Sequence, residues 1–331
     1  MHKIYYDHDA DLNCIKDKTI GIIGYGIQGR AQALNLRDSG LTVFVANRND
    51  SYEHEALEDG FRVYPLSDIA ENSDLLMLLI PDQAHAEVFK TFLKSKLKPG
   101  TLFIVAHGFS LYFKTFDCPD NIDVAMLAPR MPGQQIRESY LKGGGIPAFV
   151  DVIQNKTDLA LPRILGLAKG AGFTRAGVLE VNYRVETELD LFVEQFLIPN
   201  IIKTIDIGFR TLVDEFQFPP VATLMELYAS GELAEVLKMA AEMGIGQAFE
   251  KNASPTCQFG IASRFDSALE KNPYEQAKGV MRDIRNQTFK NALEEEAKID
   301  YQTVKKLWQE VNHPSLLEAH HHISSLFKKT P

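Results

Sequence analysis

Cysteine, long hydrophobic runs and signal-like segments are scarce or missing in this sequence. Its 331 residues include three cysteines, Cys14, Cys118 and Cys257, whose wide and irregular spacing gives neither a disulfide framework nor a zinc pattern. No apolar run approaches the ~20 residues that a membrane-spanning helix needs, so we expect no membrane protein. The N-terminus has no apolar segment followed by a small-residue cleavage site, which indicates a cytoplasmic location.

Basic charge is also scarce. The chain has 35 Lys and Arg against 44 Asp and Glu, which gives a net charge of −9. Phosphate backbones bind to basic surfaces, so this balance predicts no nucleic-acid partner. The length suffices for one large or two ordinary domains with their own cores.

The first half of the chain alternates apolar segments of strand length with helical patterns. Five such segments are Thr19–Ile23, Leu41–Ala46, Leu75–Ile80, Leu102–Val105 and Val124–Leu127. Helical spacing follows at 28–39 and 83–95. Further strand patterns at Pro147–Ile153 and Thr174–Leu179, around a helical stretch near 157–170, are expected to complete the sheet. This alternation predicts an α/β fold with a Rossmann-type, doubly wound parallel sheet.

The second half has no segment of alternating polarity and reads as long helices over 185–209, 221–250 and from 276 to the end. No linker rich in Pro, Gly or Ser separates the halves. We therefore predict a dinucleotide-binding domain over residues 1–183 and an all-helical domain over residues 184–331.

A glycine-rich turn directly follows the first strand and opens a helix. Its six residues are Gly24, Tyr25, Gly26, Ile27, Gln28 and Gly29. In a GxGxxG turn the first glycine allows a tight bend, the second lets the backbone approach a pyrophosphate, and the third allows helix and strand to pack closely. Because a strand precedes it and a helix follows it, this turn predicts a dinucleotide site.

The end of the second strand bears on the choice between the two nicotinamide cofactors. Arg48 offers a guanidinium and Ser51 a hydroxyl, which suit a ribose 2′-phosphate. Asp50 would instead accept a hydrogen bond from a 2′-hydroxyl. The loop favours NADPH and leaves NADH open.

Two carboxylates lie one helical turn apart near the start of the second half. Asp190 and Glu194 share a helix face and are hard oxygen ligands of the kind that Mg²⁺ prefers. Such pairs are more often solvated surface charges, so the spacing alone does not decide between the two interpretations. His107 follows the strand Leu102–Val105 and could relay protons there, or could be a core histidine bonded to the backbone.

The chain resembles ketol-acid reductoisomerase, also called acetohydroxy-acid isomeroreductase, of the short bacterial type. The matching stretches follow the family's order along nearly the whole chain: YYDHDADL, IGYGIQGRAQALNLRDSG, LLIPDQAHAEVF, VAHGF, AKGAGFTRAGVLE, ETELDLFVEQ, GFRTLVDE and VMRDIRNQTF. The resemblance implies a Rossmann domain followed by a knotted helical domain for metal, substrate and dimerisation. It also implies a homodimer or a larger homo-oligomer.

The family converts 2-acetolactate or 2-aceto-2-hydroxybutyrate to 2,3-dihydroxy acids, by alkyl migration at a two-Mg²⁺ centre and reduction with NADPH. The resemblance implies His107 as an active-site histidine, Asp190 as a bridging metal ligand and Glu194 as a ligand of one metal. The implied cofactor residues outside the glycines are Tyr25, Ile27, Gln28, Arg48, Ser51, Asp82, Gln83, Ala84, His85 and Gly133.

Three positions depart from the family pattern. Arg130 stands where the family has an active-site lysine; it keeps the charge but cannot act as a compact point donor. The family supplies two more metal carboxylates four residues apart, whereas here Glu226 is followed at that spacing by Ser230. The next carboxylate is Glu232, six residues after Glu226. On a single helix six residues turn through roughly 600°, which would place Glu232 on another face than Glu226. Ser254 matches a substrate-contacting serine, but its neighbours differ.

These departures leave alternatives open. A divergent member could reduce a 2-keto acid with NAD(P)H and lack the isomerase step, since reduction needs less of this apparatus. A β-hydroxyacid dehydrogenase would share the two-part organisation but use a lysine and no metal. A nucleotide-binding paralogue without catalysis would need neither His107 nor the paired carboxylates.

Overall fold

The structure is a computed structural model that describes residues 3–265, 273–311, 314–315 and 317–319. The chain divides into two compact units, Met1–Asp190 (unit 1) and Leu191–Pro331 (unit 2). Within the described residues no helix has both the length and the apolar character to cross a bilayer. Each unit is described separately below.

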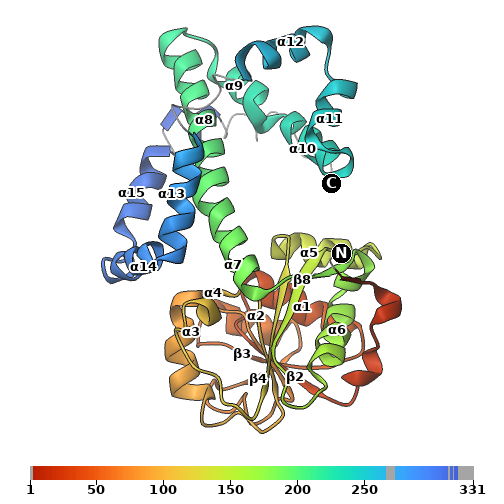
Figure 1. Ribbon diagram of the computed structural model, residues 1–331. Helices are drawn as coiled ribbons and strands as arrows, with labels where there is room; N and C mark the ends of the chain where they lie inside the picture. The colour runs from red at the N-terminus through yellow and green to blue at the C-terminus, as the bar shows by residue number, and fades with distance from the viewer. Residues whose placement is uncertain (1–2, 266–272, 312–313, 316, 320–331) are drawn as a thin grey trace. The chain divides into compact units, whose positions relative to one another are not determined.

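Unit 1 is built on a nine-stranded sheet with the order β1-β9-β8-β7-β6-β5-β2-β3-β4 (Figure 1). Its strands are β1 Ile4–Tyr5, β2 Thr19–Ile23, β3 Thr42–Ala46, β4 Arg62–Tyr64, β5 Leu75–Leu78, β6 Leu102–Val105, β7 Asp123–Pro129, β8 Ala148–Gln154 and β9 Val178–Glu180. The six strands from β4 to β7 are parallel. The predicted doubly wound α/β fold is confirmed.

The far edge of the sheet differs from the predicted all-parallel arrangement. Strand β8 runs antiparallel to β7, and Ala148 at its start pairs with Pro129 at the end of β7. The connecting helix α5, Gly133–Leu141, packs on α1. The chain then re-enters the sheet at the end where β7 finished, so β8 runs back alongside β7. Polarity patterns predict strands but not their direction, which is why the sequence did not show this.

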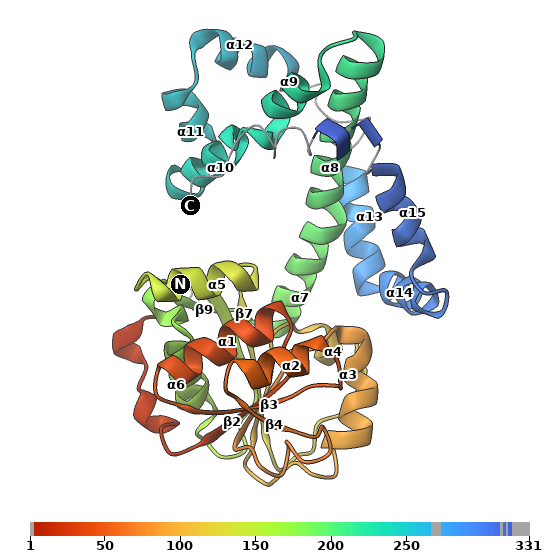
Figure 2. The ribbon, with the colours of Figure 1, turned by 180° about the vertical axis from the view of Figure 1, so that it is seen from behind.

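Helices cover both faces of the sheet, with α1 and α6 on one face and α3 on the other (Figures 1 and 2). The helices are α1 Ile27–Asp38, α2 Ser51–Glu58, α3 Asp82–Val88, α4 Phe109–Tyr112, α5 Gly133–Leu141 and α6 Ala160–Ala171, with shorter turns η1 Asp7–Asp9, η2 Leu12–Cys14, η3 Phe89–Leu93 and η4 Phe173–Arg175. Successive residues of a strand enter opposite layers: Ile104 packs in one core, and Phe103 and Val105 in the other.

The described part of unit 2 is helical, as predicted. Its segments are η5 Val193–Leu197, α8 Ile198–Arg210, η6 Thr211–Glu215, α9 Pro220–Leu224, η7 Met225–Ala229, α10 Glu232–Met243, α11 Ile245–Asn252, α12 Pro255–Arg264, α13 Pro273–Arg285, α14 Thr288–Lys298 and α15 Gln302–Val311. They follow α7 Tyr183–Phe192, which begins in unit 1.

The single helix expected over 221–250 is interrupted. Gly231 has a φ of +89°, a left-handed conformation that ends one helical segment before α10 begins at Glu232. Ser230 accepts a hydrogen bond from the N–H of Glu232 through its hydroxyl at 3.4 Å. Glu226 and Glu232 therefore belong to different helical segments, and the argument from rotation along one helix is wrong.

Candidate functional site

The turn after β2 places its glycines as dinucleotide binding requires. Gly24 has a φ of +96°, and a Cβ atom there would lie 2.5 Å from the carbonyl oxygen of Leu79. A Cβ atom on Gly29 would lie 2.0 Å from the carbonyl oxygen of Gly24, so α1 packs directly on the turn. Gly26, which caps α1, would have no atom within 4 Å of such a Cβ. This open side, at a helix N-terminus, suits an anionic group.

A cavity of about 510 Å³ lies beside this turn in unit 1. Its apolar wall includes Leu66, Ile80 and Val88, and its polar edge is formed by Arg48 and Asp50. The cavity's size, with an apolar wall and a few polar groups, is typical of a site for an adenosine-like moiety. Among the residues expected to bind the cofactor, those that line it are Gly24, Gly26, Ile27, Gln28, Arg48 and Ala84.

The loop after β3 is held by Asp50. Its carboxylate accepts hydrogen bonds from Arg48 Nε at 2.7 Å, from Asn47 Nδ2 at 2.7 Å and from the N–H of Tyr52 at 3.0 Å. The Arg48 hydrogen bond is the largest of several interactions that hold the pKa of Asp50 below its ordinary value. The Arg48 side chain is 82% exposed. Ser51 starts α2 in this loop.

The other residues expected at the cofactor site do not line this cavity; they contribute to the packing and hydrogen bonding of unit 1. Tyr25 is fully buried, and its hydroxyl donates to Asp59 at 2.8 Å. His85 is 3% exposed; Nδ1 lies 2.9 Å from the Ser110 hydroxyl, and Nε2 lies 2.9 Å from the Ile80 carbonyl oxygen. A Cβ atom on Gly133 would lie 2.1 Å from the Ile27 carbonyl oxygen. Asp82 and Gln83 begin α3.

At the carboxyl end of β6, His107 meets the start of α7. Glu186, in the first turn of α7, is completely buried and accepts a hydrogen bond from the N–H of Gly108 at 3.0 Å. One oxygen of the same carboxylate lies 3.1 Å from His107 Nδ1. A Cβ atom on Gly108 would lie 2.3 Å from the Thr187 hydroxyl, which shows how closely α7 packs on this loop.

Arg130, directly after β7, completes a cluster with these residues. Its Nη2 lies 3.3 Å from Glu186 Oε1 and 3.2 Å from Asp190 Oδ1. Asp190 Oδ2 also lies 3.7 Å from His107 Nδ1. Two carboxylates thus face a guanidinium and an imidazole at the edge of the sheet where the glycine-rich turn also lies. In a doubly wound fold this edge carries the ligand sites.

The cluster shifts the titration of its members. Burial disfavours the charged form of His107, but the hydrogen bond to Glu186 and the charges of Glu186, Asp82 and Asp190 outweigh it and raise the pKa of His107 to about 9. Burial raises the pKa of Asp82, and Glu186 and Asp190 add to that rise against the opposing histidines. The carboxylates around His107 therefore favour its charged form.

The donor set of this cluster fits a divalent cation. One ligand atom each from His107, Glu186 and Asp190 lies within 4.8 Å of the others. Glu186 is enclosed, whereas the Asp190 side chain is 30% exposed and can be reached by an ion. Carboxylate oxygens are the ligands that Mg²⁺ prefers.

The remaining predicted ligands belong to unit 2. Glu194 lies in η5, Glu226 in η7 and Glu232 at the first position of α10. Ser254 caps α12 by accepting a hydrogen bond from the N–H of Cys257 at 3.3 Å.

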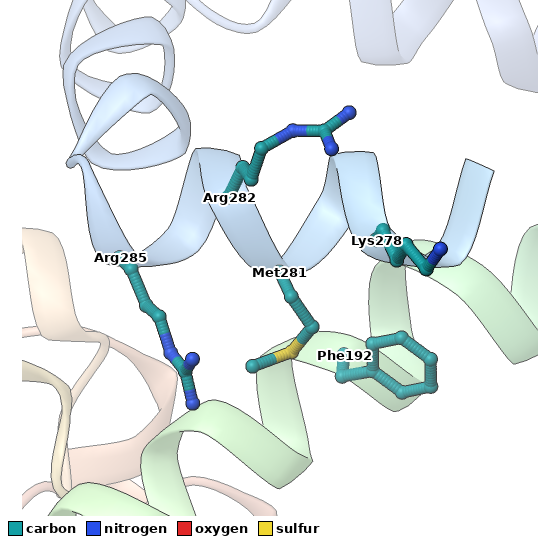
Figure 3. Close-up of a pocket in the computed structure, with 5 residues that line it drawn as sticks. All are labelled: Phe192, Lys278, Met281, Arg282 and Arg285. Carbon is teal, nitrogen blue, oxygen red and sulfur yellow. The ribbon is translucent and has the colours of Figure 1, made fainter. Parts of the chain in front are cut away.

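A pocket of about 440 Å³ within unit 2 contains none of the predicted residues (Figure 3). Met281 and Arg285 point from α13 toward the helix that carries Phe192, and Arg282 points away. Lys278 and Arg282 form ion pairs with Glu275.

Comparison with known proteins decides the family. Residues 14–177 match the family model described as acetohydroxy acid isomeroreductase, NADPH-binding domain, and residues 183–329 match that of the ketol-acid reductoisomerase C-terminal domain. The chain belongs to the ketol-acid reductoisomerase family.

Individual ketol-acid reductoisomerases resemble the chain over most of its length. The NADP(+) enzyme of Pyrobaculum arsenaticum is 38% identical over 316 residues, 95% of each chain. That of Methanocaldococcus jannaschii is 35% identical over 301 residues, 90% of each chain. The solved structure of an NADH-preferring ketol-acid reductoisomerase from an uncultured archaeon matches with a TM-score of 0.92 and 30% identity, covering 99% of this chain and all of that one.

The sequence analysis did not single out Glu186, which the structure places at the centre of the cluster. Its signal was present, because Glu186, Asp190 and Glu194 recur every four residues along one helical stretch. Only the last two were selected as a pair. Sequence spacing does not show which carboxylate of the three is buried. Glu186 stands out only once the fold shows that it contacts His107 and Arg130.

Proposed function

We propose that this protein is a Mg²⁺- and NADPH-dependent ketol-acid reductoisomerase that converts 2-acetolactate or 2-aceto-2-hydroxybutyrate to 2,3-dihydroxy acids. The observation that carries the proposal is the cluster of His107, Arg130, Glu186 and Asp190 at the same sheet edge as the glycine-rich turn. Family membership supports it. Residues 1–183 would bind the dinucleotide, and residues 184–331 would form the knotted metal, substrate and dimerisation domain.

Each side chain of the cluster has a role in this proposal. Asp190 would be a Mg²⁺ ligand in unit 1, and Glu194, Glu226 and Glu232 are the metal ligands proposed in unit 2. When bound, Mg²⁺ supplies Lewis-acid chemistry for the alkyl migration and NADPH supplies the hydride. Glu186 orients His107 through Nδ1, which leaves Nε2 as the ring nitrogen that exchanges a proton with the substrate. Arg130 contributes a permanent positive charge that would stabilise negative charge developing on the substrate.

The decisive experiment compares two substrates. Purified protein with Mg²⁺ is expected to oxidise NADPH when given 2-acetolactate, followed by the loss of NADPH absorbance. Turnover of 3-hydroxy-3-methyl-2-oxobutyrate but not of 2-acetolactate would instead support a 2-keto acid reductase without isomerase activity. Inactivity with both substrates would contradict both assignments.

One observation favours the alternative of a 2-keto acid reductase without isomerase activity. Ser230 follows Glu226 at the spacing where a second carboxylate is expected, and its hydroxyl is used at the start of α10. Glu232 is the carboxylate left to replace it and lies on a separate helical segment. A weakened second metal site would impair migration more than hydride transfer, because migration needs both ions.

The Asp50→Asn protein is expected to use NADPH better relative to NADH. Asparagine can still cap α2, but it lacks the charge that holds Arg48 and repels a 2′-phosphate. We expect the ratio of kcat/KM for NADPH to that for NADH to rise about tenfold, equivalent to ~1.4 kcal/mol. Glu53→Gln, with the same loss of charge on α2, is the control. An unchanged ratio, or a shift toward NADH, would contradict this role.

A further inference from the structure

A single nitrogen of Arg130 lies between the two carboxylates of the cluster. Nη2 is 3.2 Å from Asp190 Oδ1 and 3.3 Å from Glu186 Oε1, so one NH2 group faces both carboxylates. Its guanidinium carbon also lies 5.0 Å from the centre of the Phe149 ring, and the Arg130 backbone N–H donates to the Pro147 carbonyl oxygen at 2.9 Å. The guanidinium thus contacts two carboxylates and an aromatic ring, while the main-chain hydrogen bond holds the Arg130 backbone.

This position conflicts with an ion bound by Asp190 Oδ1. Mg²⁺ binds carboxylate oxygens at about 2.0–2.1 Å, which would place it in the space next to Nη2. Like charges this close repel strongly in a partly buried site. Arginine cannot relieve the repulsion by losing its proton, because it stays charged in proteins. The guanidinium must move before Asp190 Oδ1 can bind a divalent ion.

We propose that Arg130 is an internal cation that competes with the divalent metal for Asp190, so that metal binding requires the guanidinium to leave that carboxylate. The inference rests on the proposed metal dependence of the reaction. It assigns Arg130 to the control of metal affinity, in addition to any contact with substrate.

The same guanidinium compensates the charge of a buried carboxylate. Glu186 is completely buried, and an unpaired buried charge is strongly destabilising. The guanidinium, the Gly108 N–H and His107 all contact that carboxylate and compensate its charge. A metal bound by Asp190 would therefore replace an ion pair between Asp190 and Arg130.

Metal affinity measured without substrate tests the exchange. The full-length protein is titrated with Mn²⁺ alone, and free Mn²⁺ is followed by electron paramagnetic resonance. Arg130→Gln is expected to lower the dissociation constant at least tenfold, and Arg130→Lys less, because a flexible ammonium is not held on the Phe149 ring. Arg184→Gln removes the same charge from the start of α7, where Arg184 stacks on Tyr112 and Tyr183, and is expected to change the constant less than twofold.

Three outcomes would overturn the inference: unchanged affinity in Arg130→Gln, weaker affinity in that variant, or an equal gain in Arg184→Gln. If Arg130→Gln does not fold, Phe149→Leu keeps the guanidinium but removes its aromatic support, and is expected to tighten Mn²⁺ binding about threefold; no change would also overturn it. Because the readout needs no turnover, tighter binding in a protein inactive on 2-acetolactate would support the inference while contradicting the proposed function.

Discussion

Replacing Asp190 by asparagine is expected to lower kcat for 2-acetolactate at least 10³-fold, about 4 kcal/mol of transition-state stabilisation. Asp190 is the carboxylate of the cluster that an ion can reach, since its side chain is 30% exposed while Glu186 is enclosed. Asparagine has the same shape but no charge, so it is a much poorer ligand for Mg²⁺. Mg²⁺ binding, measured by calorimetry, is expected to weaken in parallel.

Glu188→Gln is the matched control for Asp190→Asn. It removes one negative charge from the same helix, and its carboxylate accepts a hydrogen bond from the Tyr112 hydroxyl at 2.8 Å, away from the cluster. We expect its kcat to stay within threefold of the unmodified protein. An Asp190→Asn protein with kcat within tenfold of the original would contradict metal ligation by this residue and would favour a metal-free dehydrogenase mechanism.

The central sheet was predictable because its strands are buried on both faces. Leu75–Leu78 and Leu102–Val105 are apolar at every position and are buried throughout, as expected for parallel strands covered by helices. The edge strands gave weaker signals. Arg62–Tyr64 and Ile4–Tyr5 are short and partly exposed, so their pairing depends on neighbours that no local pattern encodes.

The candidate site was predictable where one short stretch carries the chemistry. The glycine-rich turn is such a stretch, and each of its glycines has the packing that its spacing implies. The cluster is different, because His107, Arg130 and Glu186 follow or begin three separate elements. Their convergence results from parallel strands ending at one edge, and a single sequence contains no direct signal for it.

Helix breaks in unit 2 were missed for a related reason. The residues around Ser230 and Gly231 have apolar neighbours at helical spacing, which predicted one continuous helix. The positive φ of Gly231 ends that helix and begins another. A glycine within a helical pattern can be tolerated or can end the helix, and the tertiary context decides which.

Glu186→Gln is expected to lower kcat at least 10²-fold, about 2.7 kcal/mol, with little change in KM. Glutamine can still accept the Gly108 N–H, so the loop is retained. It lacks the charge that holds His107 and faces Arg130. The kinetic constants for 2-acetolactate measure the effect. Asp151→Asn weakens only the start of α7, where Asp151 accepts the Tyr183 N–H at 2.7 Å, and is expected to change kcat less than threefold.

A double-mutant cycle with His107 separates orientation from a general loss of structure. If Glu186 acts by orienting His107, then Glu186→Gln in a His107→Gln background removes an interaction already lost. The double variant should then be close to the His107→Gln protein in kcat, far from the product of the two single effects. Fully multiplicative effects, or an Asp151→Asn protein as impaired as Glu186→Gln, would mean that Glu186 supports the placement of α7 and does not position the histidine.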